Sequence, residues 1–243
     1  MIDALPRKAY LRGMSDWIGI FETTDGLRGW RFHSGAPVSF ATGHSPAEIT
    51  AQLGEADMFI IAPSRSAQKV PLKLLPVGAF TDVQDGPSRL PASVRLQLLG
   101  FQSNDNDWDG VALVLTKSHS YWCLLSAQEL IGFQAFLTPR LIQALEAPAQ
   151  SDPDALSETL SRPERLAAHL AASEHKPSAQ TGHLIGAELG AARAWWLGQQ
   201  VAILGPKTLA QGYAAGLTAQ GVPVTCHDDP SPLGLVALRG QVG

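Results

Sequence analysis

Near its C-terminal end the sequence passes from an apolar strand to an amphipathic helix and then to a second strand. Val201–Leu204 is a short apolar run, and Leu209, Tyr213 and Leu217 then recur at every fourth position, as on one face of a helix. Val222–Cys226 follows as the second strand. This succession of strand, helix and strand favours an α/β fold over an all-β one.

Other local patterns predict further elements. Trp17–Phe21 and Leu27–Phe32 lie on either side of the polar turn Glu22–Gly26, which predicts a β-hairpin with a loop of about five residues. Ser45–Glu48 has the pattern of a capping box and predicts the start of a helix. Met58–Ala62 is predicted to be a buried strand.

The middle of the chain carries two turn-rich stretches. Phe80–Pro91 predicts a hinge near residue 90, which divides the 243 residues into an N-terminal lobe (1–91) and a C-terminal lobe (92–243). Ala147–Ser157 is predicted to be a linker or surface loop. Helices are predicted over Ala92–Gln102, after the capping box Ser161–Glu164, and over Gly182–Leu197.

The composition fits a globular protein and argues against several functional classes. Hydrophobic residues make up 45% of the chain, which excludes a wholly disordered protein. With a net charge of −4 and only 18 Lys and Arg residues, nucleic acid is not an expected partner. The expected location is the cytoplasm, because Cys123 and Cys226 favour a reduced thiol pair and neither a signal peptide nor a membrane span is found.

Three polar turns are candidates for phosphate or acid–base chemistry, and each has an ordinary structural alternative. Leu204–Thr208 follows a strand and can offer helix N-terminal N–H groups to a nucleotide, or be a common βα turn. Glu22–Gly26 can wrap a phosphate, or be a plain hairpin turn. His119 can act as an acid–base group or phosphate donor, or do neither. Asp105, Asp107 and Asp109 match a calcium loop poorly, and no metal ligand is assigned.

Several segments also occur in the order of a known family. They are Ser161–Leu166, Leu184–Leu189 with Arg193, the Gly205 turn with Leu209 and Tyr213, Gly221–Val224, Leu98–Phe101, Asp109–Val111, Ser118–Trp122 and Ile18–Trp30. On these segments the chain resembles the 2-dehydro-3-deoxygalactonokinase (2-keto-3-deoxygalactonate kinase) family, as a divergent member.

The resemblance implies an α/β, two-lobed, actin-like or ribonuclease-H-like sugar kinase fold. It implies transfer of phosphate from ATP with Mg²⁺ to the terminal hydroxyl of a 2-keto-3-deoxy sugar acid. The partners would be a small sugar acid and a nucleotide, and the sequence leaves a homodimer open. The implied phosphate contacts are Thr24, Arg28, Ser118 and His119, the residues near the nucleoside are Gly205 and Thr208, and the candidates for binding the substrate carboxylate are Ser64 and Arg65.

The chain departs from the family at positions that carry acidic groups. Phe21 stands where the family hairpin begins with an Asp, and Ala92–Arg95 replaces an Arg-Gly-Glu-Glu stretch. Thr138–Arg140 replaces a Thr-Gly-Glu. Since these carboxylates would hold Mg²⁺ and accept a proton, their loss predicts impaired catalysis, and a non-catalytic pseudokinase that binds a metabolite or protein is the alternative.

Overall fold

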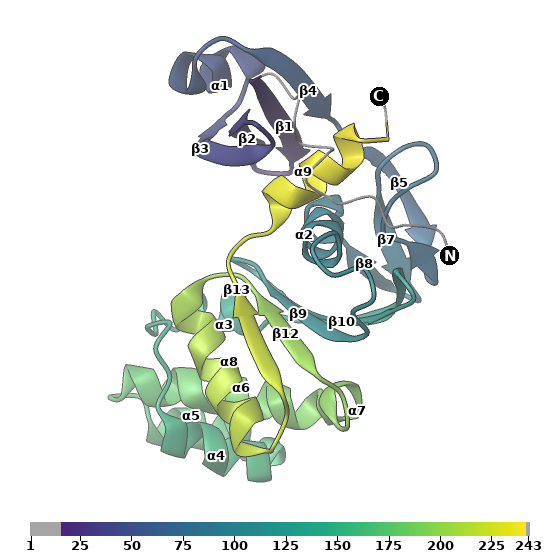
Figure 1. Ribbon diagram of the computed structural model, residues 1–243. Coiled ribbons are helices and arrows are strands. Elements are labelled where there is room, and N and C mark those ends of the chain that lie inside the picture. Colours follow the sequence, from purple (N-terminus) through teal and green to yellow (C-terminus); the bar gives the residue numbers. More distant parts are fainter. Residues whose placement is uncertain (1–15, 242–243) are drawn as a thin grey trace.

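The computed structural model describes residues 16–241, which form two larger sheets, a small third sheet and the helices that cover them (Figure 1). The first sheet has the strand order β3-β2-β1-β4, in which β4 runs parallel to β1 and the other pairs are antiparallel. Its elements are β1 (Trp17–Thr23), β2 (Gly26–His33), β3 (Ala36–Gly43), α1 (Pro46–Leu53) and β4 (Asp57–Ile61).

The second sheet repeats this arrangement and extends it. Its order is β13-β12-β9-β10-β11-β6, with β9, β10 and β11 forming an antiparallel meander and β12 and β13 added in parallel beside β9. Its strands are β6 (Leu72–Lys73), β9 (Gly110–Leu115), β10 (Ser120–Ser126), β11 (Glu129–Phe136), β12 (Val201–Leu204) and β13 (Val224–His227). Both sheets therefore contain a three-stranded meander followed, after helical chain, by a parallel strand.

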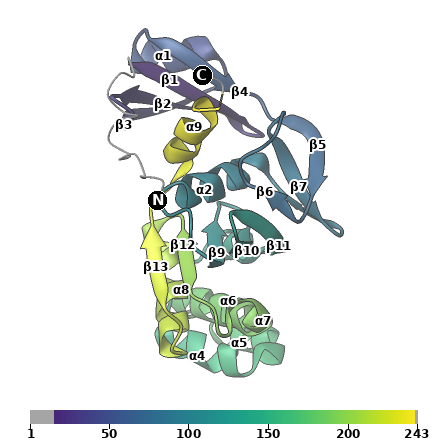
Figure 2. The same ribbon diagram turned by 45° about the vertical axis from the view of Figure 1, so that its right-hand side comes forward.

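Helices cover the second sheet on both faces, because alternate residues of its strands point to opposite sides. Along β9, Val111, Leu113 and Leu115 join the core under the C-terminal helices, whereas Ala112 and Val114 join the core that contains helix α2. Figure 2 shows the C-terminal helices gathered on one side of this sheet. These helices are α3 (Thr138–Ala144), α4 (Pro153–Ser161), the 3₁₀ turn η2 (Pro163–Arg165), α5 (Leu166–Ala172), α6 (Pro177–Ala191), α7 (Arg193–Trp196) and α8 (Lys207–Ala219).

The last helix returns to the N-terminal sheet. α9 (Ser231–Arg239) crosses α2 (Ala92–Gln102) closely, at a point where a Cβ on Gly100 or Gly234 would collide with the backbone of the other segment. Leu235 and Leu238 of α9 share one core with Trp17 of β1. The division into lobes at residue 91 stays a prediction. Helix α9 packs against β1, which precedes residue 91, and against α2, which follows it.

The described residues confirm several predicted elements. The hairpin of β1 and β2 forms, α2 has the predicted bounds, and Ser45 caps α1, where its hydroxyl accepts from the Glu48 N–H. Within residues 16–241 no helix combines the length and apolarity needed to cross a bilayer.

Other expectations were wrong in their details. The hairpin loop contains two residues rather than five, because the strands pair as far as Thr23 and Gly26. β4 is a partly exposed edge strand, not a buried one. The stretch over 80–91 contains β7 (Thr81–Asp85) and β8 (Ser88–Leu90), which form the small third sheet with β5 (Ser64–Lys69) in the order β5-β7-β8.

The predicted helix boundaries also shift in the C-terminal part. Asp152 caps α4, so this helix begins inside the predicted linker. Ser161 ends α4 instead of capping the next helix, and its hydroxyl donates to the carbonyl of Ser157. The helix predicted over 182–197 begins earlier and is divided into α6 and α7, with Gly198 beyond it at a positive φ of 76°.

Candidate functional site

A cleft of about 920 Å³ lies between the N-terminal hairpin and the carboxyl ends of parallel strands β9, β12 and β13. Three turns line it: 23–28 after β1, 115–118 after β9, and 205–207 after β12. The first residues of α2 line it as well, including Pro91 and Ser93. In α/β sheets, ligands bind at the carboxyl ends of the strands, so the cleft is the candidate functional site.

Two of these turns have the same internal hydrogen bonds. Thr23 Oγ1 donates to the carbonyl of Gly26 at 2.9 Å and accepts from the N–H of Asp25 at 3.3 Å. Thr116 Oγ1 donates to the carbonyl of His119 at 2.9 Å and accepts from the N–H of Ser118 at 3.3 Å. Each hydroxyl is thus used to fix a tight turn, and the tips of the two turns face one cleft.

Glycine allows the backbone to come close at two edges of the cleft. Gly26 has φ 125°, and a Cβ there would lie 2.8 Å from the carbonyl oxygen of Gly43. Gly205 has φ 142°, and a Cβ there would lie 2.6 Å from the carbonyl oxygen of Leu115. No side chain in the described part of the chain caps the next helix, α8, so N–H groups of its first turn are available for a negatively charged ligand.

Charged groups of both signs line the cleft. Arg28 donates to Asp229 at 2.5 Å, and Asp229 also accepts from the N–H and hydroxyl of Ser231. Lys117 and Lys207 supply further positive charge. Among the described residues, no hydrogen bond or ion pair occupies the carboxylates of Asp25 and Asp228, which leaves both able to bind a cation or accept a proton. The lining residues that carry these charges are Asp25, Arg28, Glu48, Lys117, Lys207, Asp228 and Asp229.

His119 lies at the base of the second turn. Its Nδ1 is 2.8 Å from the hydroxyl of Ser118, and its ring stacks on Tyr121 with centroids 5.6 Å apart. Burial and, to a lesser degree, the charge of Arg140 lower the pKa of His119. Both effects favour the neutral imidazole, which can accept or donate a hydrogen bond without carrying a charge.

A buried carboxylate ties this turn to the helices behind it. Glu188 of α6 accepts from the Ser120 hydroxyl at 2.7 Å, from the Trp122 indole N–H at 2.8 Å and from the Tyr213 hydroxyl at 2.8 Å. Thr138 supplies another hydrogen bond. Burial raises the pKa of Glu188, and these donors oppose the rise. The network fixes the start of β10, one residue beyond His119.

The structure brings most of the predicted phosphate and nucleoside residues to the cleft. Thr24, Arg28, Ser118 and Gly205 line it. His119 lies beside Ser118, and Thr208 is exposed on the first turn of α8, next to the lining residue Lys207.

The two predicted substrate-binding residues lie on β5 of the small sheet. Ser64 pairs with the β7 region and its hydroxyl hydrogen-bonds to that of Ser66, outside the described residues that line the cleft. The side chain of Arg65 is not among the described parts of the chain.

The departures from the family pattern take different positions. Phe21 is 1% exposed and packs edge-on against Phe80, and Val94 is fully buried beside the cleft. Arg95 does not line the cleft: it is buried beside Phe80 and donates to the carbonyls of Lys73 and Leu74 and to Gln68. The positive charge at position 95 therefore has a structural role, although burial lowers the pKa of Arg95 to about 10.

Acidic residues that would have to replace the missing ones lie in different parts of the structure. Asp25 lines the cleft. Asp109 lies at the opposite end of β9 from the Thr116 turn and accepts from the N–H of Ala127. Asp107 precedes it in the same loop, so neither reaches the cleft.

Sequence reasoning missed Asp228 and Asp229, which directly follow β13. Their signal was present, because the strand over 222–226 was predicted and acidic residues after a parallel strand lie at its carboxyl end. Lys117 and Lys207 were missed because a lysine in a turn has no distinguishing spacing.

Comparison with protein families gives a match to 2-keto-3-deoxy-galactonokinase over residues 143–238. Comparison with curated protein sequences gives no match. Among solved structures, a protein from Sinorhizobium meliloti named as a 2-dehydro-3-deoxygalactonokinase is similar, with a TM-score of 0.75 and 18% identity. The alignment covers 93% of this chain and 99% of that one.

Two more distant structures share the fold. The activator of 2-hydroxyisocaproyl-CoA dehydratase from Clostridium difficile, with bound ADPNP, has a TM-score of 0.53 and 11% identity, covering 92% of both chains. Component A of (R)-2-hydroxyglutaryl-CoA dehydratase from Acidaminococcus fermentans has a TM-score of 0.51 and 11% identity, covering 92% and 95%. These likenesses confirm the actin-like sugar kinase fold, and the family match over the C-terminal part confirms the resemblance to a divergent relative.

Proposed function

We propose that this chain, a divergent relative of the 2-keto-3-deoxy-galactonokinases, is a sugar-kinase-like phosphotransferase that binds a nucleoside triphosphate in the cleft. The observation that carries the proposal is the meeting of two matching threonine turns, 23–26 and 116–119, with the Gly205 turn at one cleft. The N–H groups of such turns and of a helix N-terminus are suited to phosphate oxygens.

The residues present fit a nucleotide and a divalent cation. At Gly26 and Gly205 a Cβ would clash with a carbonyl oxygen, so glycine allows the backbone to come close at the cleft. Lys117 and Lys207 line the cleft and would offset the negative charge of a nucleotide. Asp25 and Asp228 are carboxylates that would hold Mg²⁺, the ion that neutralises charge developing on a transferred phosphate. Either carboxylate is also a candidate to accept the proton of a substrate hydroxyl.

The proposed acceptor is a small 2-keto-3-deoxy sugar acid. This rests on the family match over residues 143–238 and on the cleft volume of about 920 Å³, which accommodates a nucleotide and a small acid together. Ser64 and Arg65 stay candidates for binding the substrate carboxylate, and the location of Ser64 outside the cleft lining gives it no support.

A second candidate function is nucleotide or metabolite binding without catalysis. It is favoured by one observation: two positions that carry acids in the family are apolar here, with Phe21 in the core and Val94 at the cleft. Losing one catalytic acid or base costs about 10²–10⁴ in rate. We therefore expect slow turnover if Asp25 or Asp228 substitutes, and none if neither does.

The deciding experiment measures ADP release from ATP with 2-keto-3-deoxygalactonate at high enzyme concentration. The wild type, Asp25→Asn, Asp228→Asn and the control Asp105→Asn, which changes an exposed acid outside the cleft, are compared. Sugar-dependent turnover that Asp105→Asn retains and either cleft variant loses supports a kinase. No turnover in a protein that binds ATP supports the second candidate instead.

A further inference from the structure

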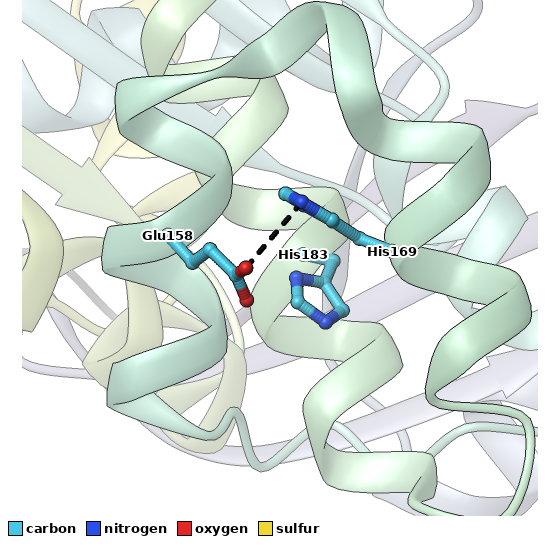
Figure 3. Close-up of side chains that lie close together, drawn as sticks. All are labelled: Glu158, His169 and His183. Atoms are coloured by element: carbon cyan, nitrogen blue, oxygen red, sulfur yellow. Dashed lines mark ion pairs between the residues drawn. The ribbon is translucent and has the colours of Figure 1, made fainter.

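Three helices of the C-terminal part bring two imidazoles and a carboxylate together, away from the cleft. Glu158 comes from α4, His169 from α5 and His183 from α6, and the carboxylate of Glu158 points toward both rings (Figure 3). Each residue offers one ligand atom, and these atoms all lie within 4.8 Å of one another. None of the three lines the cleft.

One nitrogen of this cluster lacks a partner. His169 Nε2 is buried and makes no hydrogen bond to any residue in the described range 16–241. Its nearest charged neighbour is Glu158 Oε1 at 3.5 Å, which is too long for a good hydrogen bond. Two ligands of a tetrahedral Zn²⁺ ion, each at roughly 2.0–2.1 Å from the metal, lie about 3.3 Å apart. The separation of these two atoms is therefore that of two ligands sharing one ion.

Thr159 orients both rings. Its Oγ1 lies 2.6 Å from Nδ1 of His169 and 2.8 Å from Nδ1 of His183, and the residue is fully buried. A hydrogen bond from Nδ1–H of His169 to this hydroxyl leaves the lone pair on Nε2, the nitrogen that faces Glu158. Such a second hydrogen bond is what fixes the tautomer and direction of a metal-binding histidine.

The cluster is also accessible. The Glu158 side chain is 60% exposed, whereas that of His169 is 7% exposed, so an ion can enter from the solvent on the Glu158 side. The ligand atoms lie at most 4.8 Å apart, so bringing them to tetrahedral spacing needs at most about 1.5 Å of movement.

We propose that Glu158, His169 and His183 bind a first-row transition metal ion such as Zn²⁺, with water in the remaining position. Two imidazoles and one carboxylate suit Zn²⁺ rather than Mg²⁺, which prefers oxygen ligands alone. Because the three ligands come from three helices, the ion would cross-link α4, α5 and α6. The proposal goes beyond the phosphotransferase function and does not depend on it.

The test is calorimetric titration of tag-free protein with ZnCl₂ and with MgCl₂, in the absence of nucleotide. A Cys226→Ser background removes the exposed thiol, which could bind zinc elsewhere. Glu158→Gln removes the ligand carboxylate at an exposed position, and Glu164→Gln is the matched control, an exposed acid on η2 outside the cluster. We expect one Zn²⁺ per chain in the parent and in Glu164→Gln, and at least tenfold weaker binding in Glu158→Gln.

A second pair of variants tests the role of Thr159. Thr159→Val removes the hydroxyl and should weaken Zn²⁺ binding by about 10–100-fold, whereas Thr159→Ser should restore it. Visible absorption of bound Co²⁺ then reports coordination directly, and circular dichroism verifies that each variant is folded. Absence of 1:1 Zn²⁺ binding, or equal affinity in Glu158→Gln and Glu164→Gln, overturns the proposal.

Discussion

Arg28 Nη2 and Asp229 Oδ2 lie 2.5 Å apart and join the N-terminal hairpin to the segment that leads into α9. The two residues are 201 positions apart in the chain. The guanidinium also lies over the rings of Trp30 and Phe40, with its carbon 4.9 and 5.4 Å from their centroids. This ion pair therefore links two segments that line the cleft, and it offsets part of the positive charge of Arg28.

A double-mutant cycle of Arg28→Ala and Asp229→Ala measures how strongly the pair couples. Both side chains are about one-third exposed, at 30% and 33%, so the expected coupling is about 0.2–1 kcal/mol and decreases with added salt. Asp229→Ala should lower the free energy of unfolding more than Arg28→Ala does, because it also removes the acceptor for the N–H and hydroxyl of Ser231. Urea denaturation provides the free energies, and a coupling above about 2 kcal/mol would contradict this account.

Local sequence patterns were enough to predict the hairpin, α1, α2 and the Gly205 turn. In each case the signal lies within a few neighbouring residues, as with Ser45 and Glu48 at the start of α1. The burial of β4 was predicted wrongly, because an apolar run does not show whether a strand is central or at a sheet edge.

Features that depend on contacts between distant segments could not be predicted. α9 contains Gly234, which disfavours a helix, and it forms where Leu235 and Leu238 pack into the core around Trp17. Asp25 and Asp228 follow different strands, β1 and β13, so that both line one cleft depends on the fold. The repeated topology of the two sheets likewise leaves no repeat in the sequence.

Gly205→Ala tests the close approach of the backbone at the cleft. The new Cβ would clash with the carbonyl oxygen of Leu115, and a φ of 142° is unfavourable for alanine. We therefore expect the free energy of unfolding to fall by about 1–3 kcal/mol and nucleotide binding to weaken. Gly198→Ala is the control, because its φ is 76° and nothing lies within 4 Å of the added Cβ. Equal nucleotide affinity in the two variants, measured by calorimetry, would show that the Gly205 turn does not contact the ligand.

Replacement of Glu188 tests the buried network behind the second turn. Glu188→Ala leaves the donors of Ser120, Trp122 and Tyr213 without an acceptor and should cost about 3–5 kcal/mol. Glu188→Gln keeps an oxygen for two of these donors and should cost much less. Chemical denaturation of both variants checks this order, and a similar loss in the two would argue against a role for the hydrogen bonds.

The same network predicts a pH dependence. The folded pKa of Glu188 is raised above the reference value of 4.5, so the native state binds the proton more tightly than the unfolded state. Glu188 therefore contributes fully to the free energy of unfolding of the wild type below pH 4.5. This contribution decreases as the pH rises through the pKa of Glu188 in the folded protein. Glu188→Gln lacks this decrease, so the stability difference between wild type and Glu188→Gln should shrink as pH increases.

Phe21→Asp restores the family's residue type but should unfold the protein rather than create a kinase. Phe21 is 1% exposed and packs on Phe80, so the change removes core volume and buries a charge, at a cost of several kcal/mol. Phe21→Leu, the apolar control, should cost about 1–2 kcal/mol. Thermal melting compares them, and a stable Phe21→Asp protein with increased turnover would be contrary to expectation.

The most direct test of the proposed cleft is calorimetric titration with ATP and ADP, with and without Mg²⁺. We predict binding that Mg²⁺ strengthens in the wild type and in Asp105→Asn. In Asp25→Asn and Asp228→Asn this Mg²⁺ dependence should be lost, because a carboxylate that would hold the ion is gone. Absence of binding at millimolar nucleotide, or the same Mg²⁺ dependence in all four proteins, would contradict the assignment of this cleft as the nucleotide site.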